Sequence, residues 1–452
     1  MSTEIKYYED LMIHRIGEDV FVVDAEGKKY LFDNVTGSVA KLSDDLDLDD
    51  SDMMQKLYEK LDPRRPFKRV FTPQEFIKND QVGRLMLYLT NTCNMRCIYC
   101  HCDSTVGDNM SDKTIDRTLE KYFEHVEPRV EIMRAHDELP QITFMGGGEP
   151  FMRFNKIKGV VTKFDAKCDR LGLTPEYLLV TNTTLGSDED WRWLVDHNFT
   201  LNLSLDGPRN IQNRNRPLTG NRKSFDLTDY RLKFLSELGA KVHVRSTVIN
   251  AEEVSAICDY FKRYTCVQSH ALEPVSIAGR ATENGEIIQV DTRKFYNDFY
   301  RAYSKYLFTE PEHFQSAWFK PFKRTKGYCG AVYMNSVVLT SGTIVLCSEI
   351  DLDETPDYIK DEFVVASVYG DGDVFKSKKA YEFSERHELD REPYCKNCII
   401  KYKCGGGCYI KKIRDFFHNE KGFYSTFCKS AISLSISYLI YALEKNMEES
   451  NN

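Results

Sequence analysis

The most constraining feature of the sequence is a run of three cysteines placed directly after a short apolar segment. Cys93, Cys97 and Cys100 follow Leu85–Leu89, which has the composition of a buried strand. Thiolates with three and then two residues between them can ligate three irons of a four-iron cluster and leave the fourth iron open. A zinc knuckle or three buried thiols are the alternatives. The run therefore predicts a strand that ends at an iron–sulfur site.

The residues inside this run narrow the assignment. An aromatic residue, Tyr99, precedes the last cysteine. With it, the run resembles the cluster motif of radical S-adenosylmethionine (SAM) enzymes. The resemblance implies that SAM chelates the open iron and is reductively cleaved there, and that Tyr99 belongs to the cofactor-binding site.

A second set of cysteines lies late in the chain. It has seven members, which are Cys329, Cys347, Cys395, Cys398, Cys404, Cys408 and Cys428. Four residues separate Gly342 from Cys347. Their order resembles the SPASM domain, an extension with two auxiliary 4Fe–4S clusters. The alternative for the Cys395–Cys408 block is zinc, which paired Cys-x-x-Cys sites often bind. The resemblance implies a distal cluster on Cys395, Cys398, Cys404 and Cys428, and a proximal cluster on Cys329, Cys347 and Cys408.

Residues 81–310 alternate apolar strand-like segments with helix-like segments, which predicts an α/β fold with a parallel sheet. The six expected strands are Leu85–Leu89, Ile142–Met145, Tyr177–Val180, Leu201–Leu205, Val242–Val248 and Val267–Val275. Six such units fit the partial (β/α)6, TIM-like barrel of radical SAM enzymes. In parallel barrels the chemistry collects where the strands end, and the first cysteine run lies at such a point.

Motifs at the other strand ends supply the remaining cofactor contacts. Phe144-Met-Gly-Gly-Gly-Glu-Pro150 resembles the segment that binds the methionine amino group of SAM. The residue types suit this role, because glycines expose the backbone to a ligand and a carboxylate can accept hydrogen bonds from an ammonium group. Ordinary turn or core roles are the alternatives for each position. By resemblance, the cofactor-binding residues are Gly147, Gly148, Glu149, Thr183, Ser204, Asp206, Arg245 and Leu272, with Arg245 at the methionine carboxylate and Leu272 at the adenine.

Residues 1–80 form a separate small unit. Val20–Asp24 and Lys29–Asp33 read as two strands joined by a turn at Gly27, and helical patterns follow over Thr36–Leu42 and Asp49–Leu61. This arrangement resembles the winged-helix leader-recognition element of ribosomal-peptide maturases, which captures a leader as an added strand. A purely structural cap is the alternative.

Composition limits the other classes of function. The net charge of −8 argues against nucleic acid as a partner, and no apolar stretch reaches membrane-spanning length. The polar N-terminus carries no secretory signal, so we expect a cytoplasmic protein.

Residues 311–452 are expected to form the SPASM region and to end in a helix over Ala431–Leu443. Four more cysteines fit no ligand spacing and are expected to be buried, namely Cys102, Cys168, Cys258 and Cys266.

Two departures from the family pattern bear on the reaction. Sulfatase-activating relatives carry a cysteine where this chain has Asn335, and an aspartate where it has Ser348, followed here by Glu349. The proximal cluster is then left with three cysteines, and its remaining iron is open, or is closed by a non-cysteine group or by the substrate. We therefore expect a maturase that links a Cys sulfur to a carbon of a precursor peptide with a leader, and draws electrons from a flavodoxin- or ferredoxin-type donor. The alternatives are a carbon–carbon link, epimerisation, decarboxylation, formylglycine formation on a sulfatase, or a zinc-bound scaffold without activity.

Overall fold

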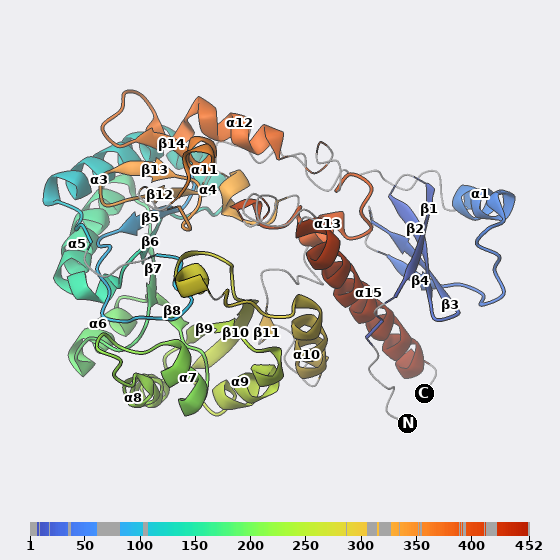
Figure 1. Ribbon diagram of the computed structural model, residues 1–452. Helices are drawn as coiled ribbons and strands as arrows, with labels where there is room; N and C mark the ends of the chain where they lie inside the picture. Colours follow the sequence, from blue (N-terminus) through green and yellow to red (C-terminus); the bar gives the residue numbers. More distant parts are fainter. Residues whose placement is uncertain are drawn as a thin grey trace.

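The fold is built around one large sheet, with a small second sheet beside it (Figure 1). The computed structural model describes residues 7–8, 10–17, 19–34, 38–60, 82–102, 107–285, 287–304, 314–315, 327–333, 335–350, 352, 355–387, 389, 391, 395–410, 412 and 423–450. The small sheet and the long C-terminal helix lie to one side of the large sheet.

Six parallel strands form the centre of the large sheet, as the sequence predicts. Each neighbours the next in chain order, and they are β5 (Leu85–Tyr88), β6 (Gln141–Met145), β7 (Glu176–Thr181), β8 (Thr200–Ser204), β9 (Val242–Val248) and β10 (Val267–Pro274). Helices connect them on the outside: α3 (Asp112–Val126), α4 (Val130–Ala135), α5 (Phe154–Leu171), α6 (Asp188–Asp196), α7 (Arg209–Asn215), α8 (Phe225–Glu237) and α9 (Val254–Phe261). The α/β class and the mostly parallel central sheet are therefore confirmed.

The two faces of this sheet differ in burial. Side chains that face the helices are fully buried, as Leu87, Phe144 and Leu203 show. The opposite face, which we call the lumen face, is partly open and carries polar residues at the carboxyl ends of the strands, among them Ser204 and Arg245. Strand periodicity alone produces this division, because successive side chains point to opposite faces.

The late part of the chain extends the large sheet. β12 (Ser336–Val338) pairs in parallel with β5, and β13 (Thr343–Val345) and β14 (Val364–Ser367) continue antiparallel beyond it. β11 (Phe314–Gln315) adds to β10 at the other edge. The large sheet therefore includes strands from both sides of the predicted boundary between residues 310 and 311, which itself lies outside the described residues.

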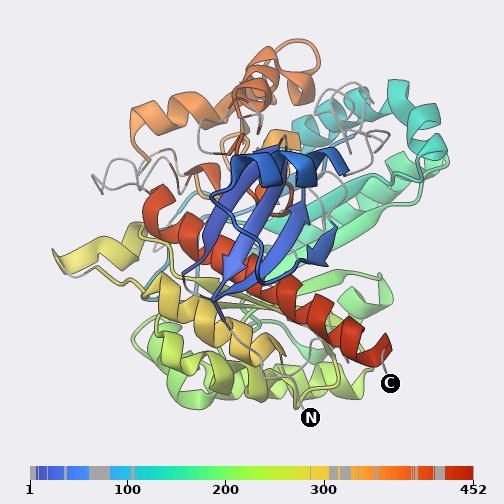
Figure 2. The ribbon, with the colours of Figure 1, turned by 90° about the vertical axis from the view of Figure 1, so that its right-hand side faces the viewer.

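Helices complete the late region of the chain. They are α10 (Thr292–Ser304), α11 (Asp357–Phe363), α12 (Lys378–Arg386), α13 (Lys401–Cys404) and α15 (Phe423–Ser450). α15 contains the predicted helix and packs between α10 and the small sheet (Figures 1 and 2). None of the helices in the described ranges is long and apolar enough to cross a membrane.

The small sheet is an antiparallel meander. Its strands are β1 (Met12–Gly17), β2 (Val20–Ala25), β3 (Lys28–Asp33) and β4 (Val39–Lys41), followed by α1 (Ser51–Lys60). Glu26 and Gly27 both have positive φ, which fits a tight turn between β2 and β3. The predicted helix over Thr36–Leu42 is wrong: Val39–Lys41 pair with the outer edge of β3, and residues 35–37 lie outside the described part.

Candidate active site

The first cysteine run forms a loop directly after β5, and a distant segment holds it in place. Backbone hydrogen bonds join Arg96 N to Pro217 O at 2.7 Å and Ile98 N to Asn215 O at 3.0 Å. Thr219 N donates to the carbonyl of the same loop at Asn94, at 2.9 Å. The loop that carries Cys93, Cys97 and Cys100 is therefore paired along its length with residues 215–219.

A second segment closes on the other side of the loop. Arg280 donates from its backbone N to Cys100 O at 2.9 Å and from Nε to Cys97 O at 3.0 Å. Gly279 has φ of 53°, and a Cβ there would lie 2.4 Å from Cys100 O. Only glycine allows this approach, so the Gly279–Arg280 pair fixes the end of the loop.

The glycines after β6 pack against the same loop. A Cβ on Gly148 would lie 2.1 Å from Thr92 O, and one on Gly147 would lie 2.9 Å from Asn91 Oδ1. The space beside Gly148 is therefore taken by the protein's own backbone. This gives these two predicted residues a packing role in addition to the ligand contact that the sequence suggested.

Glu149 is 3 % exposed and links three elements. Its Oε1 accepts from Thr181 Oγ1 at 2.6 Å and from Phe151 N at 3.0 Å, and its Oε2 accepts from Asn182 N at 2.8 Å. Burial raises the pKa of this carboxyl, and the hydrogen bond from Thr181 opposes the rise. Because a carboxylate can accept about four hydrogen bonds, one place remains for an ammonium donor.

The end of β7 also reaches the loop. Asn182 Nδ2 donates to Asn94 Oδ1 at 2.9 Å, and Asn94 Nδ2 donates to Thr184 Oγ1 at 2.8 Å. The predicted contact Thr183 is 1 % exposed, and its φ of 66° is a left-handed conformation. Its hydroxyl donates to Asn182 O, so Thr183 shapes the turn that presents Asn182 to the loop.

A buried polar triad lies beneath the loop. Tyr99 OH donates to Asp206 Oδ2 at 2.5 Å and accepts from Arg216 Nη1 at 2.8 Å. Asp206, which is fully buried, also accepts from Thr247 N. The structure thus brings the predicted residues Tyr99 and Asp206 together and adds Arg216.

Two of the predicted cofactor contacts share the lumen face. Ser204 pairs in register with Arg245, so both point to that face, where Arg245 is exposed. Leu272 instead pairs with Ser246 on the helix-facing side and is fully buried. The lumen-facing residues of that strand are Ala271 and Glu273, so the strand register separates Leu272 from the other contacts.

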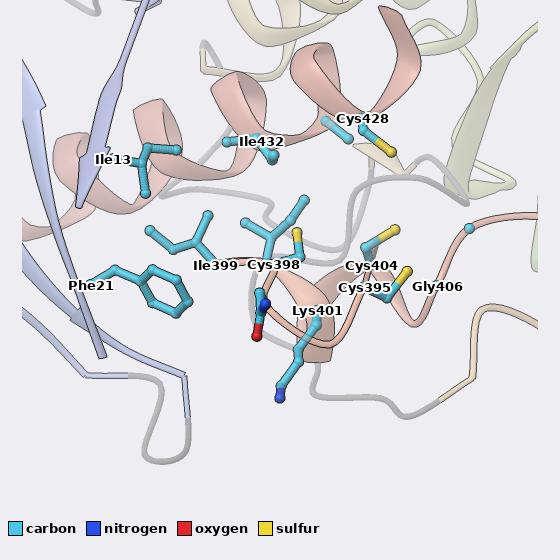
Figure 3. A pocket seen from close by; sticks show the side chains of 14 residues that line it. Ile13, Phe21, Cys395, Cys398, Ile399, Lys401, Cys404, Gly406, Cys428 and Ile432 are labelled. Atoms are coloured by element: carbon cyan, nitrogen blue, oxygen red, sulfur yellow. The ribbon is translucent and has the colours of Figure 1, made fainter. Parts of the chain in front are cut away.

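The four distal cysteines surround one cavity. The sulfurs of Cys395, Cys398, Cys404 and Cys428 point into a space of about 270 Å³ (Figure 3). Ile13 and Phe21 of the small sheet form the opposite wall. Among the residues that the structure describes, no three His, Cys, Asp or Glu side chains form a group that could hold one metal ion.

The proximal cysteines come from both sides of β12 and β13. Cys347 lies two residues beyond the end of β13, and Ser348 O accepts from Tyr88 OH of β5 at 2.6 Å. Burial raises the pKa of Cys347, and the nearby Glu349 and Cys408 raise it further. Metal binding at this site must therefore displace protons from the thiols.

Comparison with known proteins identifies the first site. A family model described as the radical SAM superfamily matches residues 87–262, which include the cysteine loop, the Gly147–Glu149 turn and Asp206. The chain is a radical SAM enzyme. This assignment implies bound SAM and a 4Fe–4S cluster.

Individual relatives of this radical SAM enzyme cover most of it at low identity. The serine-type anaerobic sulfatase-maturating enzyme of Klebsiella aerogenes is 23% identical over 72% of this chain and 78% of its own length. The structure of anSMEcpe with bound AdoMet has a TM-score of 0.61 at 16% identity, over 80% of this chain and 99% of that one. The structure of Streptococcus suis SuiB bound to precursor peptide SuiA has a TM-score of 0.51 at 15% identity, over 89% of this chain and 97% of that one. These solved structures support a common fold.

Sequence reasoning missed several residues of the radical SAM site. Arg216, Gly279 and Arg280 hold the cysteine loop, yet none belongs to a motif that we recognised. Asn94 lies inside the cysteine run, but the sequence suggested no role for it. For Gly279 and Arg280 a signal existed, because a Gly-Arg pair closely follows the last barrel strand. Arg216 carried no recognised signal, because its hydrogen-bond partner in the loop, Tyr99, lies 117 residues away in the sequence.

Proposed function

We propose that this radical SAM enzyme matures a ribosomally made precursor peptide by joining a Cys sulfur to a backbone or side-chain carbon as a thioether. The observation that carries the proposal is the small sheet docked against the distal cysteines. Its strand β1 is an edge strand whose Met12 and Ile13 are 59% and 37% exposed. Such an edge can accept a leader peptide as an added strand.

The small sheet is attached at several points, which suits a domain that must hold a peptide in a fixed position. Arg15 Nη1 donates to Asn397 Oδ1 at 2.7 Å, and Asn34 Nδ2 donates to Cys398 O at 3.0 Å. Both partners lie in the distal cysteine block. A leader bound on β1 would therefore sit close to that block. SuiB, which is similar in fold, has been solved with its precursor peptide.

The proposal includes two auxiliary 4Fe–4S clusters in addition to the one at the first loop. Cys395, Cys398, Cys404 and Cys428 would hold the distal cluster, and the convergence of their sulfurs on one cavity fits that group. Cys329, Cys347 and Cys408 would hold the proximal cluster and leave one iron available to a substrate thiolate. A flavodoxin- or ferredoxin-type protein would supply electrons.

The cofactor supplies the power to remove a hydrogen atom from an unactivated carbon, and the residues of the lumen hold the reactants. We assign Arg245 to the cofactor carboxylate, Glu149 to its ammonium group and Ser204 to its ribose side. Thr183 and Asp206 position these groups through the turn and the triad described above. Tyr88, also on the lumen face, ties β5 to the segment after Cys347.

A sulfatase-maturating activity is the second candidate, because curated relatives carry that name. The cysteine-type enzyme of Clostridium perfringens is 22% identical over 75% of this chain and 91% of its own length. Against this candidate, Asn335 and Ser348 stand where those relatives are expected to have a cysteine and an aspartate. The small sheet would also have no evident role on a folded sulfatase.

Mass spectrometry distinguishes the candidates. The chain is co-expressed anaerobically with a small cysteine-rich peptide encoded beside it, and the product is reduced and treated with a thiol-alkylating reagent. Loss of paired hydrogens together with cysteines that no longer alkylate supports the thioether. The same hydrogen loss with every thiol reactive, or an aldehyde at the modified residue, refutes it. A Cys347→Ala variant that keeps its other clusters serves as the control and should form no crosslink.

A further inference from the structure

The charges beneath the first cysteine loop are unusually well enclosed. Arg216 is 8% exposed and Asp206 is 0% exposed, and Arg216 Nη1 lies 3.8 Å from Asp206 Oδ1. Tyr99 bridges the two by accepting from Arg216 and donating to Asp206. A buried cation and a buried anion therefore form a compensated pair directly against the loop that carries Cys97 and Cys100.

The hydrogen-bond pattern identifies Asp206 as a carboxylate. It accepts from Tyr99 OH and Thr247 N, and it faces the guanidinium of Arg216. An ionised carboxylate is an acceptor only, which matches these contacts, and an arginine does not lose its proton in proteins. The pair is therefore neutral overall as long as both members are present.

The field of this pair reaches the cluster ligands. The residues on either side of Arg216 pair with the loop, since Pro217 O accepts from Arg96 N at 2.7 Å and Asn215 O accepts from Ile98 N at 3.0 Å. The Arg216 guanidinium carbon lies 6.0 Å from the centre of the Tyr99 ring, and Tyr99 directly precedes Cys100. At this range a buried cation favours negative charge at the cysteine site, and the Asp206 carboxylate disfavours it.

We propose that the Asp206–Arg216 pair sets the reduction potential of the 4Fe–4S cluster at Cys93, Cys97 and Cys100, with Arg216 raising the potential and Asp206 offsetting it. Reduction adds one electron to the cluster, so a buried cation favours it and a buried anion opposes it. The inference rests on the assignment of this cluster and not on the identity of the peptide. Both residues act on the cluster through space, and neither is one of its ligands.

The experiment compares variants that change the charge of the pair in steps. Asp206→Asn leaves Arg216 uncompensated, and the double variant Asp206→Asn with Arg216→Met removes both charges. Arg214→Met is the matched control, because Arg214 lies on the same segment but pairs with Glu253 and is 43% exposed. Each full-length protein is reconstituted anaerobically, and its iron content and midpoint potential are measured by EPR-monitored titration. The change that added SAM produces in the EPR signal identifies the first cluster.

We expect Asp206→Asn to increase the reduced-to-oxidised ratio at a fixed potential about tenfold, the effect of one charge at roughly 10 Å in a medium of ε about 20. Tenfold corresponds to a shift of about 59 mV for one electron. The double variant and Arg214→Met should remain close to the unchanged protein. If Asp206→Asn leaves the potential unchanged, or if the double variant keeps the full shift, the inference is wrong.

Loss of the cluster in one variant does not remove the test. If Asp206→Asn fails to bind iron, Arg216→Lys and Tyr99→Phe still report on the pair. Arg216→Lys keeps the charge and should keep the potential. Tyr99→Phe keeps both charges, so the reduced-to-oxidised ratio at a fixed potential should change by no more than a few-fold. A larger change would overturn the electrostatic account. Absence of a SAM-responsive signal in the unchanged protein would instead refute the cluster assignment itself.

Discussion

A buried ion pair attaches the small N-terminal sheet to the distal cysteine block, and its removal gives a quantitative test of that attachment. Lys401 Nζ lies 2.7 Å from Asp19 Oδ1, and the two side chains are 5% and 10% exposed. Lys401 begins the short helix α13, which ends at Cys404. Lys401→Met removes the cation and leaves Asp19 buried without its charge partner.

The expected cost follows from the burial of the pair. Removing one member of a buried pair typically costs about 3–5 kcal/mol, because an uncompensated charge remains. If the small sheet opens by undocking, hydrogen exchange in β2 and β3 should accelerate by roughly a hundredfold to several thousandfold. Adding Asp19→Asn should recover most of this loss, because both charges are then gone and asparagine tolerates the positive φ of 58° at that position.

Hydrogen exchange measured by mass spectrometry on the anaerobically reconstituted protein provides the assay. Arg209→Met is the control, since Arg209 and Asp226 form an ion pair that is 59% and 71% exposed and should contribute little. If amides of α13 exchange faster while those of β2 and β3 do not, the ion pair stabilises only its own helix. That outcome would refute the reasoning that this pair holds the sheet.

Three further outcomes test other parts of the structure. Gly148→Ala should lose iron from the first site, because the added Cβ would lie 2.1 Å from Thr92 O. Gly159→Ala is the control and should retain iron, because a Cβ there meets nothing within 4 Å. Equal iron content in both variants would contradict the steric argument. Burial raises the pKa of Glu138 from 4.5 to about 7, so its contribution to stability is greatest below 4.5 and is lost as pH rises through 7. Glu138→Gln should therefore gain thermal stability over the unchanged protein as pH rises, and parallel pH profiles would argue against burial as the cause. Removal of iron with a chelator should accelerate hydrogen exchange in β1, because Ile13 lines the distal cavity; unchanged exchange would show that the cavity wall does not depend on the metal.

The barrel strands could be predicted because their signal is local. Each central strand is either a short, mainly apolar run, as in β5, or an alternation of apolar and polar residues, as in β9, so its limits in the structure agree with the sequence to within one or two residues. The β2–β3 hairpin is visible for the same reason, since Glu26 and Gly27 supply the turn. The free cysteines expected in the core, Cys168 and Cys266 among them, are buried as predicted.

The failures come from pairing between distant segments. Val39–Lys41 has no strong strand pattern, and it is extended because the outer edge of β3 offers unpaired backbone groups. β12 has only three residues, too few for a pattern, yet it continues the barrel sheet beside β5. Arg216 reaches the cysteine loop through the pairing of residues 215–219 with residues 94–98, a contact that one sequence without homologues does not reveal.

The pairing of β12 with β5 has a consequence for how the three cysteine sets are arranged. The first loop leaves the end of β5, and Cys347 leaves the end of β13, two strands away in the same sheet. Tyr88 joins these two ends directly by donating to Ser348 O.

Cys408 connects the proximal set to the distal block, because it lies four residues beyond Cys404. The distal block in turn contacts β1 and β2 through Ile13 and Phe21. The lumen, the proximal set, the distal set and the small sheet therefore follow one another through the fold, so a peptide held on β1 and an electron leaving the lumen would meet at the same cysteine block.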